Sequence, residues 1–190
     1  HILHPVDVND SVQLNGASKK IQKLILTSEI PKEIAREIFT AYGELGEGAV
    51  AVRSSATAED LPEASFAGQQ ESYLNIIGDA NVVMKVRECW ASLFGARSIF
   101  YRVQKKFDHF KVGIAVPVQK MIQSEVSGVM FTVDPISNDK NKLVIEAVWG
   151  LGDYIVQGVV TPDHFEVDKR ETKIVNKVIA HQEVMEVRNK

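Results

Sequence analysis

The residues best suited to chemistry lie together, in a stretch that directly follows a short apolar run. Arg53 opens this stretch, and its planar guanidinium can bind phosphate oxygens at two points. Short side chains follow, and they would let backbone N–H groups approach a phosphate closely. Gly68, near the end, supplies torsional freedom. The pattern is compatible with a flexible loop that binds phosphate groups, with hydroxyls from Ser54, Ser55, Thr57 and Ser65.

The same stretch also has an ordinary structural interpretation of about equal weight. The four residues from Thr57 to Asp60 match a capping box at the start of a helix, and Leu61 with Pro62 matches a turn. Loops rich in Ser, Ala and Gly are common in proteins that bind no phosphate. The residue types alone therefore leave both a plain surface loop and a phosphate-binding loop open.

The other chemical candidates are weaker. Glu146 is an acid inside an apolar run, where burial without a partner is costly, so it either faces a site or binds a basic neighbour. Cys89 stands beside Trp90 in a helical pattern and is expected to be structural. No His and Cys residues have zinc spacing, and no P-loop motif is present. The sequence therefore identifies no metal ligands.

Helical patterns dominate the first part of the chain. Residues 1–29 are mixed and predict no definite element. Pro31 suits the first turn of a helix capped by Ser28, and apolar residues at helical spacing continue that helix to Tyr42. The apolar run 49–52 that follows predicts a buried strand.

A second helical pattern follows another predicted strand, at residues 71–77. Apolar residues at i, i+3 and i+4 form one stripe, which predicts a long helix that Asp79 caps and that runs to about Phe107. Gly95 is expected to kink this helix or to divide it in two.

Beyond Gly113 the apolar period changes to that of strands. Residues 114–122 and 128–133 predict a hairpin, and Pro117 would place its first strand at an edge or a bulge. Helices early and antiparallel strands late predict an α+β fold rather than a doubly wound sheet. Three further strands are predicted, at residues 143–149, 164–167 and 173–178.

Composition narrows the function classes. The chain has 190 residues with a formal net charge of −3, and its basic residues are scattered, so we expect no nucleic-acid partner. No apolar run approaches the roughly 18 residues that span a bilayer, and no signal-peptide pattern is present. A single cysteine excludes an intrachain disulfide and favours a reducing compartment. We therefore expect a cytoplasmic protein without membrane contact. Because the chain starts at His1 rather than Met, we expect a segment of a longer protein.

The candidate loop resembles the ATP-binding domain shared by phosphoenolpyruvate synthase, pyruvate phosphate dikinase and rifampicin phosphotransferase. The runs 53–62 and 65–69 are similar to the synthase signature. Other matches follow in order within about residues 48–180, and many ordered matches are more specific than one short motif. They are residues 89–94, 107–109, 118–121, 127–132, 149–152 and 161–163.

The resemblance implies an ATP-grasp-like nucleotide-binding domain, incomplete at both ends. Residues 1–47 would be a helical or irregular part of this domain, and residues 48–190 its ATP-binding core. It also implies individual roles. Arg53 would grip the phosphates of ATP, and Gly68 would belong to the loop that covers them. Ser72 would lie near the nucleotide, with an ordinary strand serine as the alternative.

The resemblance further implies that Gln119 and Met121 lie on a hinge strand that meets adenine. A core methionine is the alternative for Met121. Adenine and phosphates need contacts from different elements, so we expect Gln119 and Met121 to line a cleft with Arg53 across it. We also expect residues 54–68 to be the most mobile internal segment without nucleotide.

The implied activity is that of phosphoenolpyruvate synthase, which converts ATP, pyruvate and water to AMP, phosphoenolpyruvate and phosphate. The phosphohistidine, the ligands of Mg²⁺ and the pyruvate-binding domain would lie outside this chain, so no catalytic residue is assigned in it and the segment alone would be inactive. A homo-oligomeric parent is compatible with the resemblance. The alternatives are a rifampicin phosphotransferase and a non-catalytic module that keeps the fold.

Overall fold

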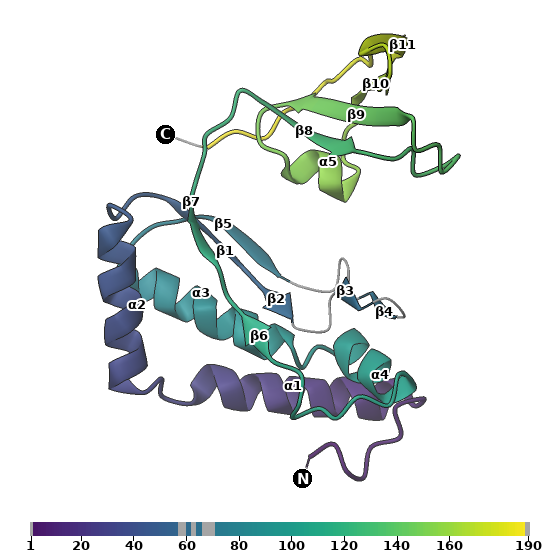
Figure 1. The fold of residues 1–190 in the computed structure, drawn as a ribbon. Helices are drawn as coiled ribbons and strands as arrows, with labels where there is room; N and C mark the ends of the chain where they lie inside the picture. Colours follow the sequence, from purple (N-terminus) through teal and green to yellow (C-terminus); the bar gives the residue numbers. More distant parts are fainter. Residues whose placement is uncertain (1, 57–59, 62–63, 66–70, 189–190) are drawn as a thin grey trace. The chain divides into compact units, whose positions relative to one another are not determined.

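The computed structural model describes residues 2–56, 60–61, 64–65 and 71–188, and only the backbone of residues 60, 61, 64 and 65. The chain forms two compact units, His1–Met121 and Ile122–Lys190 (Figure 1). The first unit combines four helices with short antiparallel strands in its described part, and the second is built on an antiparallel sheet. The expected α+β class is therefore confirmed.

The first unit is built on a three-stranded antiparallel sheet. Its central strand is β1 (Val50–Arg53), which pairs with β5 (Ser72–Ile76) on one side and with β7 (Val118–Lys120) on the other. Two smaller pairs complete the described strands of this unit. They are β2 (Ser55–Ala56) with β6 (Ile114–Ala115), and β3 (Asp60–Leu61) with β4 (Ala64–Ser65).

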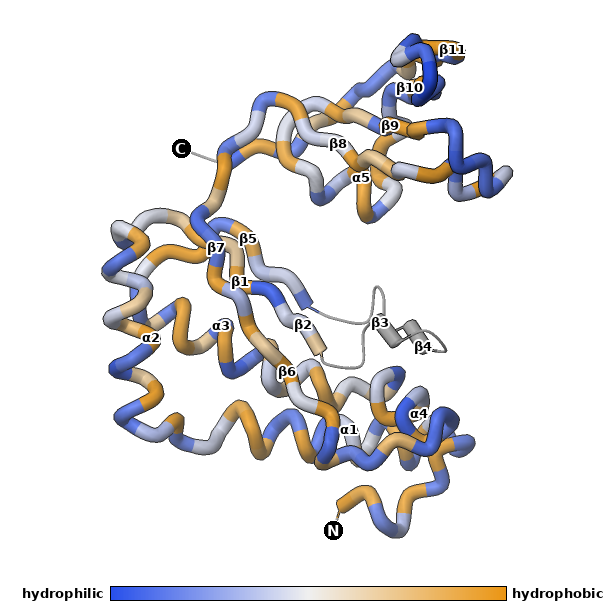
Figure 2. Tube along the Cα trace, viewed as in Figure 1, coloured by the Kyte–Doolittle hydropathy of each residue, from blue (hydrophilic) through white to orange (hydrophobic). Residues whose placement is uncertain are grey.

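Four helices accompany this sheet: α1 (Ser11–Thr27), α2 (Lys32–Glu44), α3 (Asp79–Ser92) and α4 (Ala96–Gln104). Helix α3 contacts β1 and β5 on one side and α1 on the other, so it lies between the sheet and α1 (Figure 1). Apolar residues recur between polar ones along α1 and α2 (Figure 2), which is compatible with amphipathic helices that place their apolar residues every three or four positions. None of the helices in the described ranges has the length and apolar composition that crossing a bilayer requires.

The core of the first unit forms where β1 meets α3. Val50 and Val52 are 1% and 0% exposed, and they pack with Val82, Val86 and Cys89. Successive side chains of a strand point to opposite faces, so the two valines of β1 share the face that the helix covers. Burial of these apolar side chains holds the sheet and α3 together.

Tyr42 ties three segments to this core through its hydroxyl. The ring is 3% exposed, and Oη lies 2.9 Å from the carbonyl oxygen of Glu47 and 2.8 Å from that of Gly48. The same oxygen accepts the backbone N–H of Gly78 at 3.0 Å. One buried hydroxyl therefore joins the end of α2, the entry to β1 and the start of α3.

The second unit holds the sheet β11-β10-β9-β8, in which every neighbouring pair is antiparallel. The strands predicted at residues 143–149, 164–167 and 173–178 are confirmed. The bounds in the structure are β8 (Val126–Phe131), β9 (Lys142–Trp149), β10 (Asp163–Asp168) and β11 (Lys173–Val178), and a short helix, α5 (Asp153–Gln157), contacts β9.

The predicted hairpin between residues 114–122 and 128–133 is wrong. Pro117 interrupts the first segment, so β6 pairs with β2 and β7 with β1, while β8 pairs with β9. Both segments have strand character, but their partners are distant in sequence. β8 forms six residue pairs with β9. A hairpin with β7, which is short and follows the interruption at Pro117, could not form as many pairs.

The helix predictions need three corrections. Residues 11–27 form α1, which Asp10 caps by accepting the N–H groups of Val12 and Gln13. Ser28 is the C-terminal cap of α1 rather than the cap of the next helix, which begins at Lys32. Asp79 is the first residue of α3 rather than its cap, because Gly78 takes the cap position. The long helix is divided at Gly95 and ends at Gln104, as α3 and α4.

We expect Tyr42→Phe to weaken the first unit locally. The change leaves the half-buried Gly78 N–H without its acceptor, which should cost about 1–3 kcal/mol, or roughly 5- to 150-fold in local opening. Amide hydrogen exchange at Gly78 measures this directly. Tyr154→Phe is the control, because the Tyr154 hydroxyl has no hydrogen-bond partner in the described part of the chain. Equal Gly78 exchange in both variants would contradict the role of Tyr42.

We expect Cys89 to resist alkylation in the folded protein. Burial raises the pKa of its thiol from 9.0 to about 11, and the side chain is 0% exposed. Because the folded pKa lies above the unfolded one, the neutral thiol contributes stability below pH 9 that is lost as the pH rises toward 11. Iodoacetamide at pH 8 should label Cys89 only after denaturation, whereas a cysteine placed by Ser11→Cys on the exposed face of α1 should react at once. Equal labelling of both would show that Cys89 is accessible.

Candidate functional site

One face of the central sheet carries most of the candidate residues. In the antiparallel register Ala51 lies opposite Gln119, and Arg53 lies opposite Ser72. Residues directly opposite each other point to the same face, and so do residues two apart in one strand. The four residues therefore share the face of the sheet that points away from α3. We call this set (Ala51, Arg53, Ser72 and Gln119) the polar strand face.

Arg53 provides the positive charge of the polar strand face. It is the last residue of β1, its backbone N–H donates to the carbonyl of Pro117 at 3.1 Å, and its side chain is exposed. Among the residues that the structure describes, none forms a hydrogen bond or ion pair with its guanidinium. Strand β1 thus fixes the backbone position of this exposed cation.

Gln119 and Met121 lie together, but their relation to Arg53 differs from the expectation. Gln119 is exposed in the middle of β7, and Met121 follows the strand half-buried. Both are adjacent to β1, so Arg53 is not across a cleft from them but on the neighbouring strand of the same sheet. The N–H of Met121 donates to the carbonyl of Ala49 at 2.8 Å.

The loop hydroxyls are only partly within the described residues. The Ser54 hydroxyl and N–H both donate to the carbonyl of Glu71, each at 3.1 Å. Ser55 is exposed in β2, and Ser72 is exposed opposite Arg53. Ser65 has its backbone in β4, while its side chain is outside the description. Thr57 and Gly68 lie outside the described residues, as does much of the segment 54–68 that was expected to be mobile.

Sequence reasoning missed Ala51, which lies opposite Gln119 and two residues before Arg53 on the same face of the sheet. Its side chain is 4% exposed although it points away from α3. The signal was present in the run from Ala49 to Val52, where small and β-branched residues alternate. This alternation places the bulky side chains of β1 on the core face and the small ones on the other face, where the neighbouring Arg53 and Gln119 have longer side chains.

In the second unit, Glu146 has a basic neighbour rather than a free carboxylate. Its Oε1 lies 3.6 Å from Nδ1 of His164, which is directly opposite on β10.

The neighbouring acid Glu166 is also paired. Lys142 Nζ donates to Glu166 at 2.6 Å, and this hydrogen bond, together with one from Asn176, lowers the pKa of Glu166. Within the described ranges no group of three or more His, Cys, Asp or Glu side chains could hold a metal ion.

His109, from one of the family-like runs, has a structural contact. Arg102 is 0% exposed on α4 and donates its Nε–H to Nδ1 of His109 at 3.0 Å. Burial lowers the pKa of Arg102 to about 10, which still leaves it charged at neutral pH. Burial, and then the charge of Arg102, lower the pKa of His109. A neutral imidazole is therefore the acceptor of this bond.

The amino-acid sequence of the chain is similar to those of several known proteins. A probable phosphoenolpyruvate synthase from Methanocaldococcus jannaschii is 55% identical over 99% of this chain, which spans 16% of that relative. The phosphoenolpyruvate synthase of Pyrococcus furiosus is 53% identical over 99% of the chain, which spans 24% of it. A probable phosphoenolpyruvate synthase from Archaeoglobus fulgidus is 53% identical over 97% of the chain, which spans 25% of it.

The chain thus covers a quarter or less of the length of these three relatives, while they cover nearly all of it. A family model described as the AMP/ATP-binding domain of pyruvate phosphate dikinase matches residues 1–190 without remainder. The order of the motifs and the α+β sheet architecture are compatible with that family. The chain belongs to the pyruvate phosphate dikinase AMP/ATP-binding domain family.

Proposed function

We propose that the polar strand face binds ATP, with the triphosphate at Arg53. The observation that carries this proposal is the exposed guanidinium of Arg53, which has no partner among the described residues, lies opposite Ser72 and shares a face of the sheet with Gln119. A triphosphate that leaves water needs compensating cations, and a guanidinium meets phosphate oxygens at two points. The net charge of −3 makes such a local cation more important, because the chain as a whole repels an anion weakly.

Each neighbouring residue has a matching role in this proposal. The exposed amide of Gln119 can donate to and accept from a purine edge, and Met121 can cover the face of the ring. Ser72 adds a hydroxyl beside Arg53. The segment that holds Ser54, Ser55, Thr57, Ser65 and Gly68 would fold over the phosphates with its backbone N–H groups.

We further propose an ATP-grasp-like arrangement, in which residues 1–47 belong to the same domain as the ATP-binding core at 48–190. The three-stranded sheet with its polar face supports this assignment in the first unit. Mg²⁺ would neutralise the charge of the bound triphosphate. Because the described residues bring no ligand cluster together, we assign no step to the metal, and its ligands are expected outside this segment.

The whole protein is proposed to be a phosphoenolpyruvate synthase of the cytoplasm. ATP, pyruvate and water would give AMP, phosphoenolpyruvate and phosphate by way of a phosphohistidine outside residues 1–190. The partners of this segment would be the phosphohistidine and pyruvate-binding domains of the same chain, in a protein that could assemble as a homo-oligomer. The names of the relatives favour a synthase over a rifampicin phosphotransferase, and the presence of Arg53 favours either over a non-catalytic module.

Arg53→Ala should reduce ATP binding without unfolding the protein. Loss of a hydrogen bond to a charged group costs about 1.5–3 kcal/mol, or roughly 10- to 150-fold in affinity. Phosphoenzyme formation from labelled ATP should fall at least as far, since contacts to a transferring phosphoryl group strengthen in the transition state. Arg53→Lys should recover only part of the loss, because an ammonium cannot make the planar two-point contact.

The matched control is Arg97→Ala, which removes an exposed arginine from α4 and should leave ATP affinity unchanged. Both variants are made in the full-length protein, and ATP binding is measured by calorimetric titration. Wild-type affinity and phosphoenzyme yield in Arg53→Ala would defeat the assignment of Arg53. An equal loss in Arg97→Ala would show that the effect reflects general charge rather than the site.

The isolated 190-residue segment should show no turnover with ATP and pyruvate, and weak nucleotide binding at most. The proposed mechanism takes the nucleophilic histidine, the metal ligands and the pyruvate site from other parts of the chain. Release of phosphate or AMP by the purified segment, followed with labelled ATP, would show that the catalytic groups do not lie outside the segment.

A further inference from the structure

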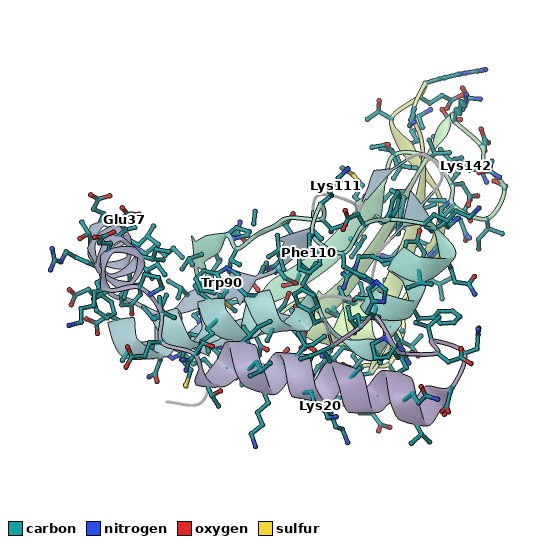
Figure 3. The ribbon with its side chains drawn as sticks, turned by 90° about the horizontal axis from the view of Figure 1, so that it is seen from below. Lys20, Glu37, Trp90, Phe110, Lys111 and Lys142 are labelled. Carbon is teal, nitrogen blue, oxygen red and sulfur yellow. The ribbon has the colours of Figure 1, made fainter. Side chains whose placement is uncertain are left out.

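A large apolar groove lies on the side of the first unit opposite to the polar strand face. It is next to the face of the sheet that α3 covers, which we call the helix face. Its volume is about 820 Å³, and α2, α3 and the segment from β6 to β7 form its walls. Glu37 of α2 and Trp90 of α3, both at this groove, are labelled in Figure 3. Apolar side chains dominate the lining, among them Ile34, Ile38, Val86, Trp90, Val116 and Val118.

Strand β7, which borders this groove, has a backbone edge that pairs with no other strand in the described part of the chain. Met121 donates its N–H to Ala49, and Arg53 donates its N–H to Pro117, while Gln119 lies opposite Ala51 between these bonds. Antiparallel pairs alternate, so residues 117, 119 and 121 direct their backbone groups toward β1. The N–H and C=O groups of Val118 and Lys120 therefore point outward. Among the described strands, β7 pairs with β1 alone.

The two features coincide at one residue. Val118 sends its side chain into the groove and its backbone groups to the open edge. An unpaired edge next to an apolar groove is what an added strand requires, since the edge supplies hydrogen bonds and the groove receives alternate side chains. The groove lies on the helix face, so this strand would leave the polar strand face open.

We propose that β7 pairs with a further strand of the same polypeptide, from outside residues 1–190, whose apolar side chains fill the groove. This inference rests on the proposed function in one respect: it takes the protein to be as long as relatives of which this chain spans 16–25%. Such relatives have ample chain to supply a strand. Two copies related by a twofold axis would instead place one concave groove against another, which fills neither.

A photo-crosslink identifies the occupant. In the full-length protein, p-benzoylphenylalanine replaces Ile34, which lines the groove and is 40% exposed, so the substitution should be tolerated. The control places the same probe at Arg36, an exposed position of α2 that does not line the groove. A mixture of unlabelled and ¹⁵N-labelled protein distinguishes crosslinks within one chain from crosslinks between two.

We expect the Ile34 probe, irradiated in purified protein, to crosslink within one chain to a segment beyond residues 1–190, and the Arg36 probe to do so at least tenfold less. A crosslink between two copies, a crosslink to residues 1–190, or a yield no higher than that of the Arg36 probe would overturn the proposal.

Hydrogen exchange tests the strand pairing independently. Without nucleotide, the amides of Val118 and Lys120 in the full-length protein should exchange at least 100-fold more slowly than unstructured amides, at any protein concentration. Exchange at unstructured rates, or protection that disappears on dilution, would overturn the pairing. Neither experiment involves ATP, so a failure here is distinguishable from a failure of the Arg53 assignment, which changes ATP binding and leaves both readouts intact.

Discussion

One face of β1 must be buried in the hydrophobic core while the other must leave a charged side chain exposed, and the rest of the structure depends on this constraint. Val50 and Val52 must be buried against α3, and this requirement fixes which way every residue of the strand points. Arg53 consequently faces away from the core. A slip of one residue in the register would drive its guanidinium into an apolar environment, where an unpaired charge is very costly. The hydrophobic core therefore also positions the candidate phosphate-binding charge.

The pairing of β5 and β7 with β1 determines which of their residues share a face with Arg53. An irregularity in the β1–β5 register between Val50 and Val52 brings Ser72 opposite Arg53, and the regular β1–β7 register brings Gln119 opposite Ala51. Polar residues from three strands thus gather on one face, although each lies far from the others in sequence. The helix face of the same sheet shows the complementary pattern, with a core at one end and an open apolar groove beside β7.

Sequence periodicity predicted the helices and strands that a local pattern of apolar residues is enough to specify. The valines of β1, the long apolar stripe divided at Gly95, and the strands β9 to β11 were all found. Helix α1 was missed because its buried side includes only Leu14, Ala17 and Ser18, a weak apolar signal. The wrong hairpin has another cause, since β7 and β8 find partners far away in the chain, and no local pattern specifies them. Of the site, residue types alone indicated only Arg53 and the loop after it, while Ser72, Gln119 and Met121 came from the family resemblance.

The most direct test of the account is a structure of the full-length protein with a non-hydrolysable ATP analogue. We expect phosphate oxygens at hydrogen-bond distance from the Arg53 guanidinium, roughly 2.7–3.2 Å, with the adenine beside Gln119 on the same face of the sheet. An analogue bound with its triphosphate elsewhere, and Arg53 still surrounded by solvent, would contradict it.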